Sequence, residues 1–448
     1  MSLYETRFGA ATRTNPLLSE KVLDEVRAEF FVRAWRERPD IFKDGEQSAA
    51  KGLFREIIKN RAAPNHVNEA LELLIRDMYG YGPINELMSN PDVTDIWIHR
   101  YDLITYEENG EVKEWQKNFL SEEHLRRTAE RMAASVGRKV DEFQPIEDCR
   151  LPDGSRVVIT IPQPSVRGTS VTIRKFSRLF TLEELAERKL FPENLVKMFK
   201  LFVKARLNIY AAGGMGSGKN TFLNALMLCV GPKENLVFVE DPAESKVGQP
   251  DPSRPWLPTP VVKVFEPRRA NAEGVGEVPI DLIFEKALRM KPTRVLVSES
   301  RCPKTTYYTL QAMNIGHPGS MSTVHAESPE EVPQRLSDML AAYPDGSYKD
   351  LTARAGKVAA VELIVYLSQL GGHRRITDVV EVRRAEESLP AIVPLFECDL
   401  KGFAPGEEPI GELKALGKTP GFLLHRKLKY FLTDREREEL GLFFKGVV

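Results

Sequence analysis

Apolar residues change their spacing along the chain, and each spacing predicts a different kind of element. Near the N-terminus they recur every three or four positions, which predicts amphipathic helices over residues 22–34 and 67–78. The second helix should end at the turn Gly80-Tyr81-Gly82-Pro83, because glycine and proline interrupt a helix there. We expect both helices to pack against their own domain.

From Val93 onward the pattern is that of strands with one helix among them. Residues 95–99 alternate between apolar and polar, and residues 105–112 predict a hairpin around Asn109-Gly110. A helix is expected over residues 121–136, followed by strands that cover residues 157–161 and 170–176. Because strands and helix do not alternate strictly, this part of the chain predicts a small α+β domain.

Beyond residue 180 strands and helices alternate, which predicts an α/β fold with a mostly parallel sheet. Thr181 and Glu184 form a capping box that predicts the start of the first helix. The expected strands are short and apolar, as strands buried on both faces are, and they cover residues 207–212, 236–239, 295–297 and 363–365.

Two later stretches look different from this core. Residues 249–258 are dense in proline, which predicts a surface loop without regular structure. The pattern weakens after residue 386, so we expect a small appendage there. Its basic stretch His425–Lys429 is interpreted as a solvated helix face.

Composition narrows the class of protein. The 448 residues suffice for two or three domains, and 42% hydrophobic residues allow a packed core. The 63 basic residues balance 64 acidic ones, so no overall charge favours nucleic acid or anionic lipid. No apolar run approaches the ~20 residues of a transmembrane helix. Four scattered cysteines predict a reduced, cytoplasmic protein whose membrane contact comes through a partner.

The strongest chemical signal is a glycine-rich loop between the expected strand 207–212 and an apolar, helix-like run over 222–228. This context is that of a phosphate-binding loop, in which backbone N–H groups and a helix N-terminus face the phosphates. Lys219 would reach the β- and γ-phosphates of a nucleoside triphosphate. The candidate nucleotide-binding residues are Gly213, Gly214, Met215, Gly216, Ser217, Gly218, Lys219, Asn220 and Thr221.

Three further candidates follow expected strands. Glu240 comes directly after strand 236–239, Glu299 comes two residues after strand 295–297, and His325 ends an expected strand that follows a glycine-rich turn. The carboxyl ends of parallel strands form the edge where ligands bind. Glu299 would hold Mg²⁺ through water or act as a base towards the attacking water. A surface acid and a structural histidine are the alternatives.

Taken together, these blocks resemble the secretion and pilus-assembly traffic ATPases, and most closely their tight-adherence pilus branch. The resemblance extends over roughly residues 65 to 385, and ordered blocks of this kind are more specific than a single motif. The blocks are Gly80–Ile84, Asp148–Arg156, Ala205–Ile209, Glu240–Glu244, Ala287–Pro292 and Leu310–Pro329.

The resemblance implies an architecture and a function. It implies a RecA-like P-loop ATPase domain over residues 179–385, preceded by an N-terminal helical extension (1–64) and an α+β N-domain (65–178), and followed by the appendage (386–448). It implies a homo-hexamer that binds ATP and Mg²⁺ between the two domains. Hydrolysis would then drive an inner-membrane pilus or secretion platform protein from the cytoplasmic side, with no direct contact to nucleic acid.

The resemblance also implies roles for single residues. Lys219 would bind phosphate, Glu299 would support hydrolysis, Glu240 would help with metal or water, and His325 would sense the γ-phosphate. The metal ligands would come from Asn220, Glu240 and Glu299. N-domain arginines reach the nucleotide in this family, and the candidates here are Arg150, Arg156 and Arg174, with ordinary surface charge as the alternative.

Asn220 departs from the pattern, because a threonine or serine is expected after the lysine to hold Mg²⁺. Thr221 cannot replace it, since one residue along a helix turns a side chain by ~100°. Ser298 likewise stands where the family has glycine. Two hypotheses therefore remain: a working ATPase motor, and a catalytically impaired nucleotide-binding subunit with a structural or regulatory role. A third reading, a nucleic-acid helicase with the same ATPase core, is disfavoured because the sequence lacks the cluster of basic residues that nucleic-acid binding needs.

Overall fold

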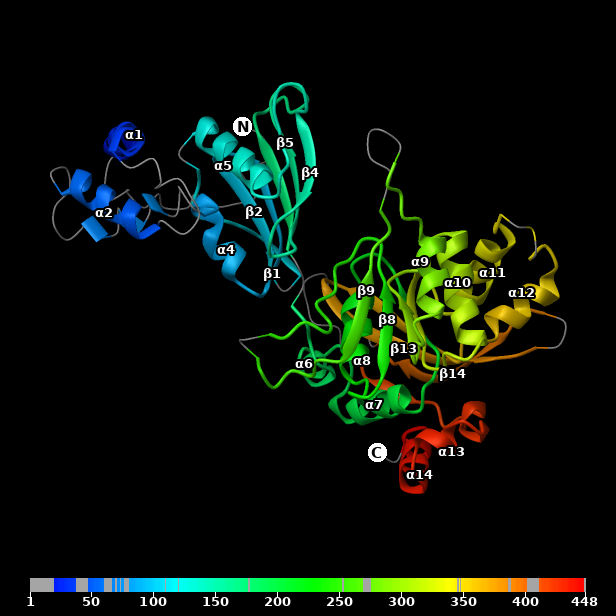
Figure 1. Cartoon of the computed structure of the whole chain (residues 1–448). Coiled ribbons are helices and arrows are strands. Elements are labelled where there is room, and N and C mark those ends of the chain that lie inside the picture. Colours follow the sequence, from blue (N-terminus) through cyan, green and yellow to red (C-terminus); the bar gives the residue numbers. More distant parts are fainter. Residues whose placement is uncertain are drawn as a thin grey trace, which may run out of the picture. The chain divides into compact units, whose positions relative to one another are not determined.

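The computed structural model contains two compact units, Met1–Phe176 and Ser177–Val448 (Figure 1). Each unit is treated on its own below. The structure describes residues 20–37, 47–59, 67–68, 71–72, 74–75, 80–108, 110–119, 121–175, 178–251, 254–268, 275–344, 346, 348–385, 388–400 and 411–446.

The N-terminal unit begins with two helices, α1 (Glu20–Glu37) and α2 (Gln47–Ile58). Their buried faces share one apolar cluster, in which the rings of Phe30 and Phe54 stack with centroids 3.7 Å apart. α1 confirms the helix predicted over residues 22–34. α2 was missed, because its apolar stripe is short and contains Gly52, which is unfavourable inside a helix.

The helix predicted over residues 67–78 lies partly outside the described residues. Its described residues, 67–68, 71–72 and 74–75, are helical. The turn at Gly80–Pro83 leads into a short 3₁₀ turn, η3 (Gly82–Ile84), and the helix α4 (Asn85–Ser89).

A six-stranded sheet follows, in the order β3-β2-β1-β6-β5-β4, with antiparallel pairing between all neighbours. The helix α5 (Glu122–Ala134) begins at Ser121, whose side chain accepts the N–H of His124, and its apolar face joins the core of the sheet. The predicted hairpin is confirmed by β2 and β3. The strands are β1 (Val93–Arg100), β2 (Leu103–Glu108), β3 (Glu111–Glu114), β4 (Ile146–Arg150), β5 (Arg156–Thr160) and β6 (Ser170–Arg174).

The C-terminal unit is organised around a nine-stranded sheet in the order β15-β14-β13-β12-β7-β11-β10-β8-β9. The six strands β12, β7, β11, β10, β8 and β9 pair in parallel with their neighbours in this order. β13, β14 and β15 extend the sheet beyond β12 in antiparallel pairs. The strands are β7 (Ile209–Gly213), β8 (Asn235–Val239), β9 (Val261–Phe265), β10 (Arg294–Val297), β11 (Met321–His325), β12 (Leu363–Leu370), β13 (His373–Arg383), β14 (Ala391–Cys398) and β15 (Leu413–Ala415).

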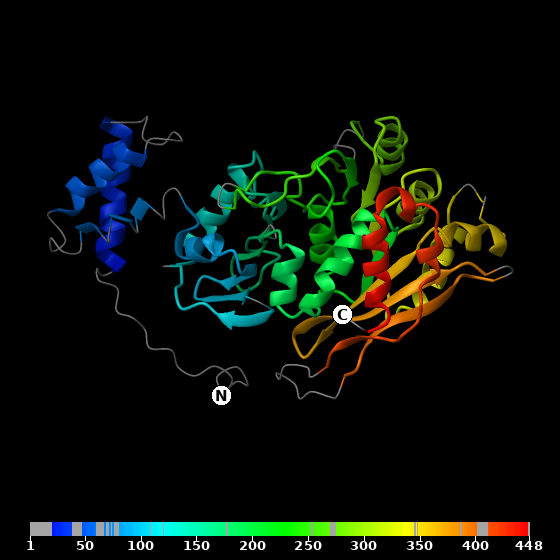
Figure 2. The ribbon, with the colours of Figure 1, turned by 90° about the horizontal axis from the view of Figure 1, so that it is seen from below.

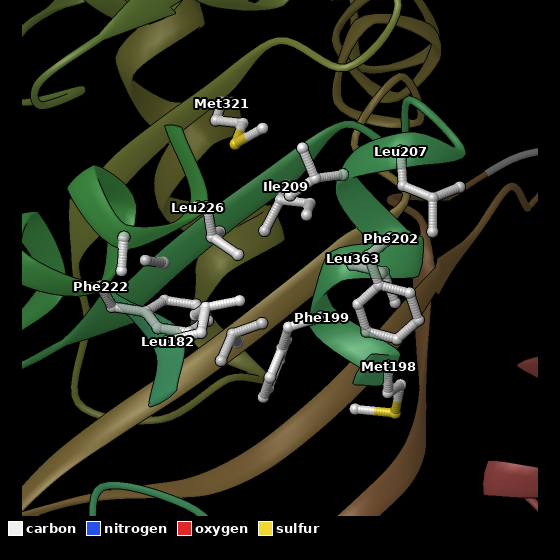
Figure 3. Close-up of a cluster of buried hydrophobic side chains, with 14 of the residues drawn as sticks. Leu182, Met198, Phe199, Phe202, Leu207, Ile209, Phe222, Leu226, Met321 and Leu363 are labelled. Carbon is white, nitrogen blue, oxygen red and sulfur yellow. The ribbon is translucent and has the colours of Figure 1, made fainter. Parts of the chain in front are cut away.

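Helices cover both faces of this sheet, which explains why its central strands are apolar throughout. Along β7, Ile209 and Ala211 join the cluster under α6, α7 and α8 (Figure 3), whereas Tyr210 and Ala212 join the cluster under α10, α11 and α12. The helices are α6 (Leu182–Glu187), α7 (Val196–Lys204), α8 (Lys219–Leu228), α9 (Ile280–Leu288), α10 (Pro303–Asn314), α11 (Glu331–Ala341) and α12 (Leu351–Val358), with a 3₁₀ turn η4 (Glu193–Leu195).

Most of the predicted local features of this unit are confirmed. The capping box between Thr181 and Glu184 opens α6. The four apolar strands predicted from the sequence correspond to β7, β8, β10 and β12. The proline-dense stretch 249–258 contains no helix or strand in the part that the structure describes.

Residues after 386 differ from the predicted appendage, because β14 and β15 extend the main sheet. The chain then forms η5 (Gly421–Leu424), α13 (Leu428–Phe431) and α14 (Asp434–Phe443), and α14 packs beside α7 (Figures 1 and 2). The prediction of a solvated basic face is wrong for Lys427, whose ammonium forms an ion pair with the buried Glu362.

Candidate active site

The glycine-rich loop lies between β7 and α8, as its sequence predicts. Gly213 ends β7 with a φ of +147°, and a Cβ atom there would lie 2.0 Å from the carbonyl oxygen of Leu367 on β12. Gly218 precedes the first turn of α8 with a φ of +96°. Only glycine adopts both conformations easily, so these positions allow the chain to turn tightly between β7 and α8.

Lys219 bends back into this loop and is buried. Its Nζ donates to the carbonyl oxygens of Gly213 at 3.0 Å and Gly214 at 2.6 Å. Burial lowers the pKa of Lys219 to about 8, although the nearby carboxylate of Glu299 opposes that shift. The ammonium therefore sits where the loop would surround phosphate, held by the weak negative ends of two peptide groups.

His325 connects this lysine to Glu299. In the sheet order β11 lies between β7 and β10, so His325 at the end of β11 is placed between the glycine-rich loop and Glu299, two residues beyond the end of β10. Its Nδ1 lies 3.3 Å from Nζ of Lys219, and its Nε2 lies 3.3 Å from Oε1 of Glu299. The structure thus joins the predicted residues Lys219, His325 and Glu299 in one row.

The charge state of His325 follows from its neighbours. Burial and the positive charge of Lys219 lower its pKa, and Glu299 raises it by a smaller amount. An ammonium that donates to Nδ1 leaves the single proton of the neutral ring on Nε2, where it is directed to Glu299. The neutral imidazole can therefore hydrogen-bond to Lys219 and to Glu299 at the same time.

Asn220 is the first exposed residue of α8, and it faces Thr323 of β11. Oγ1 of Thr323 lies 3.3 Å from Oδ1 of Asn220 and donates to the carbonyl oxygen of Ser298 at 2.7 Å. Sequence reasoning missed Thr323. Its signal is a hydroxyl residue in a short buried strand, two positions before His325.

Glu240 is buried and directly follows β8. Its carboxylate oxygens accept the backbone N–H groups of Glu244 and Ser245, both at 3.2 Å. Ser245 in turn donates to Asn224 of α8 at 3.0 Å. Burial raises the pKa of Glu240 to about 7, and the two N–H groups oppose that shift. Glu240 therefore fixes the turn that follows β8, and Ser245 links this turn to α8.

The three candidate arginines lie side by side in the N-terminal unit. Arg150 pairs with Arg156 across β4 and β5, and Arg156 pairs with Arg174 across β5 and β6. Residues that are directly opposite on neighbouring strands share a face of the sheet. Nε of Arg174 also lies 3.1 Å from Oδ1 of Asp95 on β1. The register thus produces a row of three like charges, called the arginine row below.

Sequence comparison places this chain among known proteins. The model of a family described as "Type II/IV secretion system protein" matches residues 77–371, which include the arginine row, the glycine-rich loop, Glu240, Glu299 and His325. The chain belongs to the type II/IV secretion system protein family.

Similar proteins carry related descriptions. A Mycobacterium tuberculosis H37Rv protein named for conjugal transfer is 31% identical over 72% of this chain and 90% of its own length. The type IV secretion system protein VirB11 of Bartonella quintana is 27% identical over 66% of this chain and 90% of its own. The crystal structure of the VirB11 ATPase of Brucella suis with sulphate is 26% identical, with a TM-score of 0.33 over 66% of this chain and 94% of its own.

Family membership raises the question whether the residues at hand fit the Mg²⁺ that accompanies ATP. Among the described residues, no three His, Cys, Asp or Glu side chains gather into a metal group. Mg²⁺ with a nucleotide needs fewer ligands, because water and phosphate complete its shell. The amide oxygen of Asn220 and the carboxylate of Glu299 are hard donors of the required kind, so the site of this secretion-family chain fits the ion.

In the described part of this family member, no helix combines the length and the apolar character needed to cross a membrane.

Proposed function

We propose that this chain is an ATP-hydrolysing, hexameric motor that powers pilus assembly or protein secretion at the inner membrane. The observation that carries the proposal is the row formed by Lys219, His325 and Glu299 at the carboxyl ends of parallel strands. Phosphate binding in the loop would draw Lys219 away from its carbonyl partners, and His325 would report that change to Glu299. Membership of a secretion family supports the same reading.

The individual roles follow from charge and position. Lys219 and the loop N–H groups bind the β- and γ-phosphates of ATP in a RecA-like P-loop domain over residues 179–385. Glu299 orients or activates the attacking water, and His325 senses the γ-phosphate. Mg²⁺, when bound, neutralises developing charge on the phosphates. Asn220 and Glu299 would hold the ion. Glu240 would help indirectly, because it fixes the turn that contacts α8, the helix that carries Asn220.

The arginine row is proposed as a second source of positive charge for the phosphates. Three neighbouring guanidinium groups, of which Arg174 also pairs with Asp95, concentrate positive charge that would attract an anionic ligand. The remaining parts are proposed as an N-terminal helical extension (1–64), an α+β N-domain (65–178) and a C-terminal segment (386–448). A platform protein of the inner membrane is the proposed partner, which would hold the motor at the cytoplasmic face.

The second candidate function is a catalytically impaired, nucleotide-binding subunit of such a machine. It is favoured by one observation, the amide of Asn220 at the position where a metal-binding hydroxyl is expected. The motor reading ranks first because Lys219 and Glu299, which carry the charges, are both present and both contact His325.

Mg²⁺-dependent ATP turnover of the full chain separates the two. In a motor, Lys219→Ala loses nucleotide binding, and Glu299→Gln binds nucleotide but loses turnover by about 100-fold or more. The matched controls Lys286→Ala and Glu285→Gln, on the exposed surface of α9, keep both properties. Turnover by Asn220→Thr alone, with none by the natural chain, would establish the impaired subunit instead.

Native mass with and without nucleotide tests the ring. A hexamer in either condition supports the assembly, and a strict monomer in both contradicts it.

A further inference from the structure

Thr323 binds both chain neighbours of Glu299. It is 1% exposed in β11, the strand between the glycine-rich loop and β10. Its carbonyl oxygen accepts the N–H of Ser300 at 2.8 Å, and its hydroxyl donates to the carbonyl oxygen of Ser298 at 2.7 Å. The same hydroxyl oxygen lies 3.3 Å from Oδ1 of Asn220 on α8. Thr323 therefore lies between the expected metal side chain and the expected catalytic acid.

The number of hydroxyl protons decides how Asn220 is oriented. A threonine hydroxyl has one proton and two lone pairs. The 2.7 Å contact to the carbonyl oxygen of Ser298 is the normal length of an O–H···O bond, so that contact takes the proton. Oγ1 then presents lone pairs to Asn220, and an amide oxygen opposite them is repelled. Turning the amide by half a rotation replaces this oxygen with Nδ2, which donates to Oγ1.

We propose that Thr323 is a positioning residue that, in this way, directs the amide oxygen of Asn220 away from β11 and towards the metal ion that accompanies the nucleotide. The inference rests on the proposed function. It also explains how an amide takes over from a hydroxyl. A threonine at position 220 would need no such help, because its hydroxyl is both donor and acceptor, whereas a planar amide offers oxygen on one side only.

The strength of nucleotide binding with and without metal measures this role. Binding of a fluorescent ADP analogue to the full chain is titrated in Mg²⁺ and in EDTA, and the ratio of the two dissociation constants reports metal binding. We expect Thr323→Val to reduce this ratio about 10-fold, as loss of an outer-shell partner of a metal ligand does. Thr323→Ser, which keeps the hydroxyl, should restore the ratio.

A double variant separates orientation from general damage. In Asn220→Thr with Thr323→Val, the hydroxyl ligand needs no orientation, so the ratio should return towards that of Asn220→Thr alone. Thr128→Val removes a hydroxyl that is equally buried in α5 of the other unit, and it should leave the ratio unchanged.

The outcomes distinguish this inference from the function beneath it. An unchanged ratio in Thr323→Val, or an equal loss in the double variant, overturns the role of Thr323 and leaves the motor intact. Failure of the natural chain to bind the nucleotide in either medium overturns the proposed function, and this inference with it.

Discussion

The two units present positive charge in opposite ways. Lys219 is buried among peptide groups, and its pKa is lowered to about 8. The arginine row lies on a solvated sheet, where the side chain of Arg174 is 67% exposed. Guanidinium groups stay charged at every physiological pH, whereas a buried ammonium loses its proton readily. The difference teaches that the loop's charge depends on the local fold and on pH, and that the charge of the row depends on neither.

The largest expected effect comes from the shape of the loop. Gly213→Ala would bring a Cβ atom to 2.0 Å from the carbonyl oxygen of Leu367, so β7 and β12 must separate where the loop begins. We expect the free energy of unfolding to fall by at least about 2 kcal/mol, with nucleotide binding lost. Thermal unfolding and titration with a fluorescent ADP analogue measure the two effects.

Gly356→Ala is the matched control in the same unit. Gly356 lies inside α12, and a Cβ atom there would meet no atom within 4 Å. Alanine is the better helix former, so we expect stability to rise by about 0.5–1 kcal/mol with nucleotide binding unchanged. Equal behaviour of the two variants would show that the loop does not depend on the conformation of Gly213.

The sequence predicts this loop well because its requirements are local. Glycine spacing, the preceding apolar strand and Lys219 all lie within a dozen residues. The strand β13 was missed because Arg374, Arg375 and Glu381 interrupt its apolar pattern. Glu381 is satisfied by the N–H of Phe422, forty-one positions away, and no local pattern contains that partner. Thr323 was missed for the same reason, since its partners are Ser298, directly after β10, and Asn220 on α8.

The next effect in size is a pH dependence that separates lysine from arginine. Only the protonated form of Lys219 attracts phosphate, and bound phosphate would raise its lowered pKa, so binding takes up a proton. Nucleotide affinity should therefore be constant below about pH 7 and fall about tenfold per unit above its pKa of about 8. Titrations with the fluorescent ADP analogue between about pH 6.5 and 9.5, at fixed ionic strength, cover both sides of this pKa and measure the change in affinity.

Lys219→Arg provides the control for this profile. It keeps the positive charge but does not titrate in this range, so its affinity, although weaker, should not fall with pH. A natural chain whose affinity stays constant up to the highest pH would contradict the lowered pKa and remove the contrast with the arginine row.

The smallest effect is expected in the arginine row itself. Arg156 lies between Arg150 and Arg174, so Arg156→Gln removes the central charge of the row, and the free energy of unfolding should change by less than about 1 kcal/mol. If the row supplies charge to the phosphates, the same variant should weaken nucleotide affinity by about 2- to 5-fold, at every pH. Arg127→Gln, on the exposed surface of α5, is the matched control and should change neither quantity. Unchanged affinity in Arg156→Gln would mean that the row acts on something other than the nucleotide, because losing a positive charge beside the phosphates must weaken their binding.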